Sequence, residues 1–154
     1  MKTVFYPGSF NPFTRGHADI VERLAALAGH VIIGVGINIS KPASAEQGER
    51  NAGEIRQYIR RRGLEERVEV TTYSGLTAEK ARELGADCMA RGVRSAADFD
   101  YEWQLAAINR DAFGIETLLL PADPALSFVS SSAVRELEAN GAEEIAARYR
   151  ASRI

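Results

Sequence analysis

The sequence predicts an α/β fold: a Rossmann-like, doubly wound parallel sheet of five strands that forms a single domain over residues 1–154. Short β-rich apolar runs alternate with longer stretches of helical periodicity, which is the pattern of βαβ units feeding a parallel sheet. With 154 residues, 45% apolar and 26% charged, the chain also has the size and composition of one globular domain.

Five strand-like runs carry the sheet prediction. They cover residues 2–6, 30–36, 67–72, 87–90 and 115–120. The second run is almost continuously apolar, as a strand buried on both faces requires. Pro121 closes the fifth run.

Helices are expected between and after these runs. Thr14 precedes a helical period that Gly29 ends, with four apolar residues on one face: Ile20, Val21, Leu24 and Leu27. Further helices are expected over residues 49–62, 77–84 and 98–111, the last capped by Asp98, and residues 38–47 are expected to form a loop. Residues 130–154 are expected to form one or two C-terminal helices, broken at Asn140-Gly141.

Composition narrows the setting in which the protein works. Cys88 is the one cysteine and cannot form an internal disulfide, and no charged-then-apolar leader precedes the first run, so we expect a cytoplasmic protein. No stretch of about 18 apolar residues could cross a bilayer. The formal net charge of −2 gives no global attraction for nucleic acid. We therefore expect neither a nucleic-acid nor a membrane partner, and any anion must be held by particular residues.

The unusual sequences cluster where this fold places ligands. The loops that follow the five runs are residues 7–17, 38–44, 74–77, 91–94 and 127–132. Carboxyl ends of parallel strands meet at one edge of the sheet, where doubly wound folds bind their ligands. All five loops are therefore expected to border one site.

The first loop has the chemistry of a phosphate site. Gly8 allows the main chain to approach a ligand closely. Thr14, Gly16 and His17 lie at the start of a helix, where free backbone N–H groups and the helix dipole favour an anion. His17 can donate a further hydrogen bond to an oxygen there, whereas the alternative is a helix cap beside a surface histidine.

Four motifs carry a resemblance to a known family. The stretch Thr14-Arg15-Gly16-His17 resembles the (H/T)-x-G-H signature of the nucleotidylyltransferase superfamily, and with the preceding Pro7-Gly8-Ser9-Phe10 it is similar to the bacterial phosphopantetheine adenylyltransferase family. Three later segments resemble motifs of the same family: Arg91-Gly92-Val93-Arg94, Asp98-Phe99-Asp100-Tyr101-Glu102 and Val129-Ser130-Ser131-Ser132. In order and approximate spacing the resemblance covers residues 2 to about 140.

The resemblance implies an adenylyltransferase that passes AMP from ATP to 4′-phosphopantetheine by direct in-line displacement, as in coenzyme A biosynthesis. It implies Mg²⁺ as cofactor, held by the nucleotide without a protein metal site, and a homohexamer. The implied catalytic residues are His17, Lys41 and Arg91. The implied acceptor-binding residues are Ser9, Lys41, Thr77 and Arg91. The implied ATP-binding residues are Ser9, Phe10, His17, Gly92, Val93, Arg94, Glu102, Leu126, Ser127, Phe128, Val129, Ser130, Ser131 and Ser132.

Departures from the family pattern keep alternatives open. Lys41 is followed by Pro42-Ala43-Ser44-Ala45 instead of an aromatic residue, Asn11 stands where Asp is common, and Leu126 replaces a frequent Trp. The alternatives are a transferase for another acceptor or nucleotide, such as nicotinate mononucleotide or CTP, and a nucleotide-binding module without turnover. For the residues themselves, Lys41 could be a solvated lysine, Arg91 and Arg94 could pair with Asp98 and Asp100, and the three serines could only cap a helix. Trp103, Leu105 and Ile108 are expected to pack in the interior.

Overall fold

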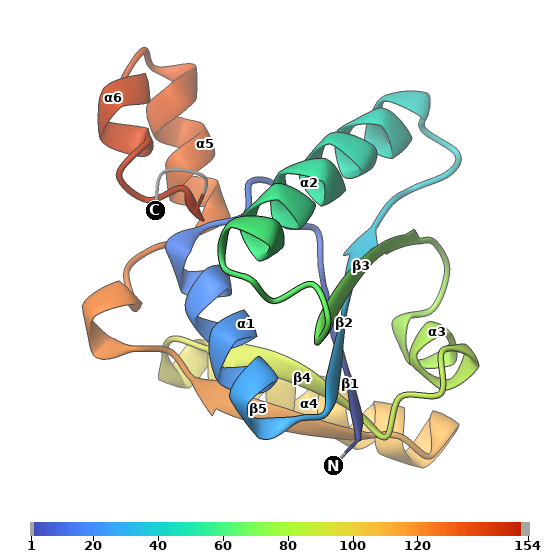
Figure 1. The fold of residues 1–154 in the computed structure, drawn as a ribbon. Coiled ribbons are helices and arrows are strands. Elements are labelled where there is room, and N and C mark those ends of the chain that lie inside the picture. The colour runs from blue at the N-terminus through green and yellow to red at the C-terminus, as the bar shows by residue number, and fades with distance from the viewer. Residues whose placement is uncertain (1, 152–154) are drawn as a thin grey trace.

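A five-stranded, wholly parallel sheet forms the centre of the protein (Figure 1). The computed structural model describes residues 2–151; residues 1 and 152–154 of the predicted domain lie outside that range. The strands are β1 (Thr3–Gly8), β2 (His30–Gly36), β3 (Val68–Tyr73), β4 (Cys88–Val93) and β5 (Glu116–Pro121). They are ordered β3-β2-β1-β4-β5, so the strand order reverses beside β1. The predicted doubly wound fold is confirmed.

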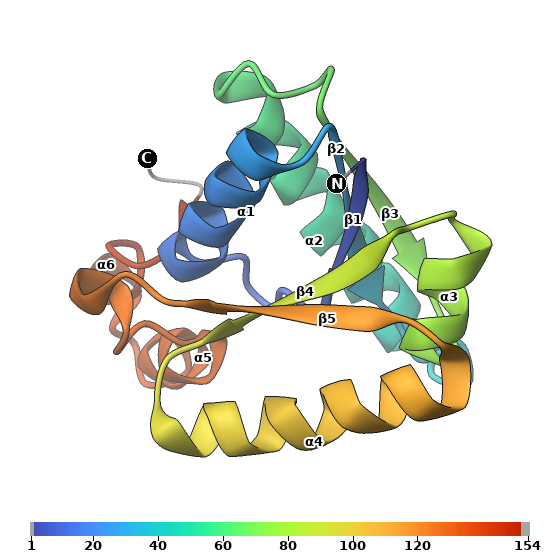
Figure 2. The same ribbon diagram turned by 90° about the horizontal axis from the view of Figure 1, so that it is seen from below.

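Helices cover both faces of the sheet (Figure 2). They are α1 (Arg15–Leu27), α2 (Pro42–Arg61), α3 (Thr77–Glu83), α4 (Ala96–Phe113), the 3₁₀ turn η1 (Pro124–Leu126), α5 (Ser131–Ala139) and α6 (Glu143–Ala146). Helices α1 and α2 lie on one face, and α3 and α4 lie on the other (Figure 2). The C-terminal helices α5 and α6 stand beside α1 (Figure 1). No helix within residues 2–151 has the length and apolar character needed to span a membrane.

Two apolar clusters hold these layers together. The larger one joins α1 and α2 to the sheet and includes Val21, Leu24, Ile33 and Ile55, all fully buried. The smaller one lies under α3 and is built on Phe5, Ile32, Ala81 and Met89. Burial of apolar surface of this kind is the main force that fixes the layers, and it leaves the carboxyl edge of the sheet open for the loops.

Helix α2 begins well before the predicted residue 49. Lys41 is its N-cap and Pro42 its first residue, so the segment expected to be a loop up to residue 47 is helical from Pro42 onward. Proline is favoured at this position because its fixed φ suits a helix and its missing N–H would be unpaired there anyway.

Strand β4 and helix α4 also differ from the prediction. Strand β4 continues through Arg91 to Val93 because it pairs with β5 over its whole length. Ser95, and not Asp98, caps α4, since the Ser95 hydroxyl accepts a hydrogen bond from the Asp98 amide. Serine is a favoured N-cap residue because its short side chain can accept a hydrogen bond from an unpaired amide of the first helical turn.

Several residues expected inside are exposed. Leu27 lies at the end of α1 and is 64% exposed, because the buried face of the helix runs through Leu24 and Ala28 and Leu27 lies off that face. Trp103 and Ile108 of α4 are 62% and 58% exposed. The sole buried residue of α4 is Glu102, so the expectation that this helix buries its apolar residues is wrong within the single chain.

Candidate active site

The loop between β1 and α1 forms a tight entry into the first helix. Thr14, 1% exposed, is the N-cap of α1, and its hydroxyl accepts a hydrogen bond from the His17 amide. In return His17 Nδ1 accepts from the Thr14 amide at 3.0 Å. This reciprocal arrangement is a capping box with histidine in the position that Glu or Gln usually holds. The signature motif is therefore also the local start signal of the helix.

Its hydrogen bond fixes the protonation state of His17. Because Nδ1 accepts from a backbone N–H, the neutral ring carries its proton on Nε2, which is then the donor available to a ligand. Burial, together with the nearby positive charges of Arg91 and Arg94, lowers the pKa of His17 to about 3. The imidazole is therefore a neutral hydrogen-bond donor at physiological pH.

Two phenylalanines set the orientation of the imidazole. The Phe10 ring meets it edge to face at 5.0 Å and the Phe13 ring stacks on it at 5.8 Å between centroids. Phe10 itself has φ of 47°, a left-handed conformation that is rare for a bulky residue. Its ring folds back over Gly8, where a Cβ would lie 3.0 Å from the ring, so glycine is needed there.

A first cavity of about 330 Å³ opens at the carboxyl edge beside this loop. Most of the predicted nucleotide residues line it: Ser9, Phe10, His17, Gly92, Arg94, Glu102, Leu126, Val129 and Ser131. Arg91, predicted as a catalytic and acceptor-binding residue, lines it as well. His17 and Arg91, 74 positions apart in the sequence by their numbering, therefore face the same space. Gly92 lies close against Ile20 in the wall of this cavity, since a Cβ at position 92 would lie 3.3 Å from the Ile20 side chain.

Arg91 is held firmly at the bottom of this cavity. Its Nε and Nη2 donate to the Glu102 carboxylate at 2.9 to 3.1 Å, and its Nη1 donates to the Pro7 carbonyl at 2.6 Å. Burial alone would lower the pKa of Arg91, but the Glu102 carboxylate outweighs it and the pKa rises. The alternative that Arg91 and Arg94 pair with Asp98 and Asp100 holds only for Arg94, which pairs with Asp98 at 3.5 Å, because Arg91 pairs with Glu102.

A second cavity of about 450 Å³ lies between the sheet, α3 and α4. It shares Pro7, Gly8, Ser9, Arg91 and Glu102 with the first, so the two spaces meet at these residues. Thr77, predicted on the acceptor side, lines it. The wall is otherwise largely apolar, including Leu76, Met89, Leu105 and Phe113.

Some predicted site residues lie outside both cavities. Lys41 is exposed at the start of α2 and lines neither one. Five residues of the ATP set are also absent from the walls: Val93, Ser127, Phe128, Ser130 and Ser132. Ser130 caps α5, since its hydroxyl accepts a hydrogen bond from the Ala133 amide. This agrees with the alternative that the serines cap a helix. The Ser131 hydroxyl donates to the Pro12 carbonyl at 2.8 Å, so it is occupied in holding the loop.

Several residues of the walls went unnoticed in the sequence, among them three with polar side chains. Tyr6 lines the first cavity, and burial raises its pKa well above the ordinary value. Asn109 and Thr117 line the second. The Thr117 hydroxyl oxygen is buried without a hydrogen-bond partner among residues 2–151. Asn109 lies in α4 and Thr117 lies in β5, and the sequence around each gives no sign of a site. The two residues share one wall because α4 packs across β5.

The carboxylates at the site do not form a metal centre. Among the described residues no three His, Cys, Asp or Glu side chains converge as metal ligands. The two carboxylates of the first cavity, Asp98 and Glu102, are each paired with an arginine. A divalent cation would therefore need most of its oxygen ligands from a ligand and from water, which is the usual manner of Mg²⁺ with nucleotides.

Comparisons with known proteins agree with this geometry. A model of the cytidylyltransferase-like family matches residues 5–137. A phosphopantetheine adenylyltransferase of Porphyromonas gingivalis is 50% identical over 132 residues, covering 86% of this chain and 84% of that protein. One of Cutibacterium acnes is 43% identical, covering 92% and 87%. Among solved structures, a bifunctional NMN adenylyltransferase/ADP ribose pyrophosphatase of Francisella tularensis has a TM-score of 0.66 at 17% identity, covering 99% of this chain and 46% of that one.

The fold and the two joined cavities are those of a nucleotidyltransferase, and the chain belongs to the cytidylyltransferase-like family. Structural likeness at 17% identity supports the fold alone. Sequence identity of 50% over most of both chains is more specific. Within the family, the chain belongs with the phosphopantetheine adenylyltransferases.

Proposed function

We propose that the protein transfers the adenylyl group of ATP to 4′-phosphopantetheine, giving dephospho-coenzyme A and pyrophosphate. The observation that carries this proposal is the junction of the two cavities at Ser9 and Arg91. The first cavity begins at a helix N-terminus and suits an anionic nucleotide, whereas the second is an apolar slot that suits the pantetheine arm. The phosphates of the two substrates can then meet at the junction. The relatives named above carry this activity in their names.

In the reaction an oxygen of the acceptor phosphate attacks the α-phosphorus of ATP. A new P–O bond forms, the bond to the β-phosphate oxygen breaks, and the electron pair leaves with pyrophosphate. Catalysis of such a step is positioning and electrostatic stabilisation. His17 donates from Nε2 to the α-phosphate as negative charge shifts, and the positive end of the α1 dipole favours the same charge.

Arg91 supplies a fixed positive charge where the two phosphates approach. Of the five N–H donors of a guanidinium, the Glu102 and Pro7 contacts occupy three, which leaves two for substrate oxygens. Arg94 adds a second charge on the nucleotide side. Lys41 is a proposed ligand of the acceptor phosphate, although its exposed position requires its side chain to reach in from the start of α2.

Mg²⁺, a homo-oligomer and a cytoplasmic location complete the proposal. Mg²⁺, bound with ATP, neutralises charge on the β- and γ-phosphates. Exposed apolar residues of α4 and β5 support assembly, as isolated chains rarely leave so many apolar side chains in water: Phe99, Tyr101, Trp103, Ile108 and Leu118. A hexamer is the assembly that the family resemblance implies.

The wall of the second cavity favours phosphopantetheine over nicotinate mononucleotide. Nicotinate mononucleotide brings a carboxylate in addition to its phosphate, which calls for a second cation. Among the described residues of this wall Arg91 is the single cationic side chain, and the proposal already assigns it to the phosphates. The pantetheine arm of phosphopantetheine is neutral, with amides and methylenes, and therefore suits the largely apolar wall of the second cavity better.

The test is pyrophosphate release from purified protein given ATP with 4′-phosphopantetheine, nicotinate mononucleotide or no acceptor, and CTP in place of ATP. We expect release with ATP and 4′-phosphopantetheine, together with dephospho-coenzyme A by mass spectrometry. Release with nicotinate mononucleotide alone would replace the proposed acceptor. ATP binding without release for any acceptor would identify a nucleotide-binding module instead.

A further inference from the structure

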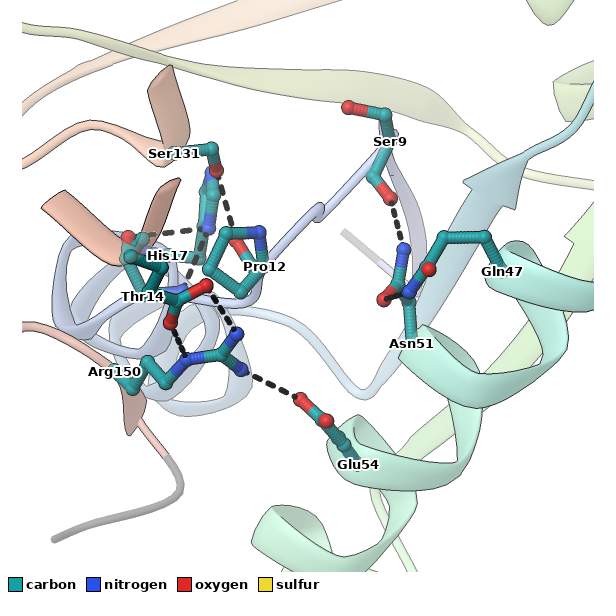
Figure 3. Close-up of polar contacts among 10 residues, drawn as sticks. Ser9, Pro12, Thr14, His17, Gln47, Asn51, Glu54, Ser131 and Arg150 are labelled. Atoms are coloured by element: carbon teal, nitrogen blue, oxygen red, sulfur yellow. Dashed lines mark hydrogen bonds and ion pairs between the residues drawn. The ribbon is translucent and has the colours of Figure 1, made fainter. Parts of the chain in front are cut away.

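Three backbone carbonyls of the loop after β1 are each held by a side chain from a distant helix, and Figure 3 shows the contacts at the Ser9 and Pro12 carbonyls. Asn51 Nδ2 of α2 donates to the Ser9 carbonyl at 3.4 Å. Arg135 Nη1 of α5 donates to the Asn11 carbonyl at 2.5 Å, and the Ser131 hydroxyl to the Pro12 carbonyl at 2.8 Å. The donors lie 42, 124 and 119 positions away in the sequence, so the loop is fixed by tertiary contacts on two sides.

The loop has a physical need for such support. Phe10 is held at φ of 47°, and a bulky residue keeps a left-handed conformation only where its surroundings over-determine it. The three held carbonyls flank this residue, one before it and two after it. Releasing them lets the Phe10 backbone return toward ordinary φ, and the Phe10 ring that packs on His17 moves with it.

Asn51 is unusual as an interior residue of α2. It is 4% exposed, and its neighbours on the same face, Ala52 and Ile55, are apolar and fully buried. Its Oδ1 accepts from Gln47 Nε2 at 2.9 Å, which sets the amide so that Nδ2 points at the Ser9 carbonyl (Figure 3). A buried polar side chain is costly unless its hydrogen bonds are made, and this one makes one to Gln47 and one to the loop.

Arg135 connects the loop with the start of α5. Besides the Asn11 carbonyl, its Nη2 donates to the Ser132 hydroxyl at 3.4 Å. Arg135 is exposed, so its removal leaves the core intact. Helix α5 thereby holds the loop at Asn11 and Pro12, while α2 holds it at Ser9.

We propose that Asn51 and Arg135 are positioning residues for the proposed adenylyl transfer: by holding the Ser9 and Asn11 carbonyls from α2 and α5 they fix the loop, and through Phe10 the imidazole of His17, in the geometry of the reaction. Neither side chain lines the two cavities. Their effect is therefore on turnover and on loop mobility, and substrate affinity stays close to that of the unchanged protein.

Arg135→Met is the cleaner test because the residue is exposed. We expect kcat to fall about tenfold, the KM for ATP to change less than twofold, and the melting temperature to stay within about 2 °C. Arg135→Lys keeps one donor and recovers part of kcat. Arg148→Met, an exposed arginine of the same C-terminal region, is the control and keeps wild-type rates. A raised KM for ATP at unchanged kcat would make Arg135 a phosphate ligand and overturn the positioning role.

Asn51→Leu tests the other side of the loop. Ile59→Val, a buried change elsewhere on α2, serves as a control for loss of stability. We expect kcat to fall at least fivefold in Asn51→Leu and to stay within twofold in Ile59→Val. Equal losses of kcat in the two variants would mean that Asn51 contributes only to folding.

Hydrogen exchange separates this inference from the proposed function. In both Asn51→Leu and Arg135→Met, peptides covering residues 8–14 should exchange severalfold faster, while those covering β2 stay unchanged. Hydrogen exchange needs no substrate. It therefore tests whether Asn51 and Arg135 hold the loop even if the unchanged protein transfers no adenylyl group. Unchanged exchange in residues 8–14 would end the proposal.

Discussion

Arg91 and Glu102 form a two-pronged ion pair that joins β4 to α4 beneath both cavities. Glu102 is the one buried residue of α4, and its side chain is 7% exposed. The pair therefore anchors the helix that closes the second cavity and, at the same time, fixes the guanidinium that lines both cavities. The fold and the proposed reaction thus depend on the same contact.

Glu102→Leu should cost both stability and rate. A buried carboxylate that is removed leaves Arg91 without its counter-charge, which costs about 3 kcal/mol in buried pairs and less here because Arg91 is 35% exposed. We expect a lower urea midpoint and loss of most activity. Arg91→Met/Glu102→Leu should recover part of the stability and none of the activity, as chemical denaturation and a pyrophosphate assay would show. A double variant no more stable than Glu102→Leu would contradict the coupling.

His17→Ala should keep ATP binding within about tenfold and reduce turnover a hundredfold or more, because the Nε2 donor acts mainly on the transition state. His17→Gln is the matched variant, since Gln at the third helical position preserves the capping box. It should match His17→Ala in turnover and exceed it in melting temperature. Calorimetric titration and single-turnover kinetics separate the two effects, and full activity in either variant would remove His17 from the mechanism.

The low pKa of His17 predicts an acid-side loss of stability. The folded chain binds this proton only near pH 3, whereas the unfolded chain binds it near 6.5. Stability is therefore complete above pH 6.5 and falls as the pH drops toward 3, with up to about 2 kcal/mol lost at pH 5. His17→Gln should lose less than the unchanged protein between pH 7.5 and 5 in urea denaturation. In proton NMR the His17 ring resonances should not titrate over that range; a midpoint near 6.5 would refute the buried neutral state.

Thr117→Val should change stability and affinity in opposite directions. Valine removes a hydroxyl that has no partner among the described residues, so the free protein should melt slightly higher. If the acceptor arm uses this hydroxyl, the KM for 4′-phosphopantetheine should rise about fivefold, equal to a neutral hydrogen bond of about 1 kcal/mol, with the KM for ATP unchanged. Steady-state kinetics with each substrate varied is the measurement, and an unchanged acceptor KM would place the arm elsewhere.

Trp103→Ser should weaken self-association. Trp103 packs beside Phe99 at 5.8 Å between ring centroids on the open side of α4, where the chain alone does not cover it. Sedimentation velocity should show a smaller species or a higher dissociation concentration. Leu27→Ser, equally exposed on α1 at the other face of the sheet, is the control. Equal effects of the two substitutions would argue against α4 as the contact.

Local sequence signals determined much of the architecture. Alternating β-rich and helical runs predicted the five parallel strands, and His30–Gly36 has the bounds expected from its almost continuous apolar run. Thr14 was recognisable as a cap since capping is a local interaction. The start of α2 was missed because the helical preference of Pro42 at the first position overrides the loop-like composition after it.

The sequence by itself determined the fold class and the helix start capped by Thr14, since both rest on short-range periodicity and backbone preference. Only the tertiary structure decided that Arg91 pairs with Glu102, that Thr117 lies in the wall of the second cavity, and that Asn51 holds the Ser9 carbonyl. These contacts join elements far apart along the chain. Their partners depend on how helices cross the sheet, which the burial of apolar surface across the whole domain sets.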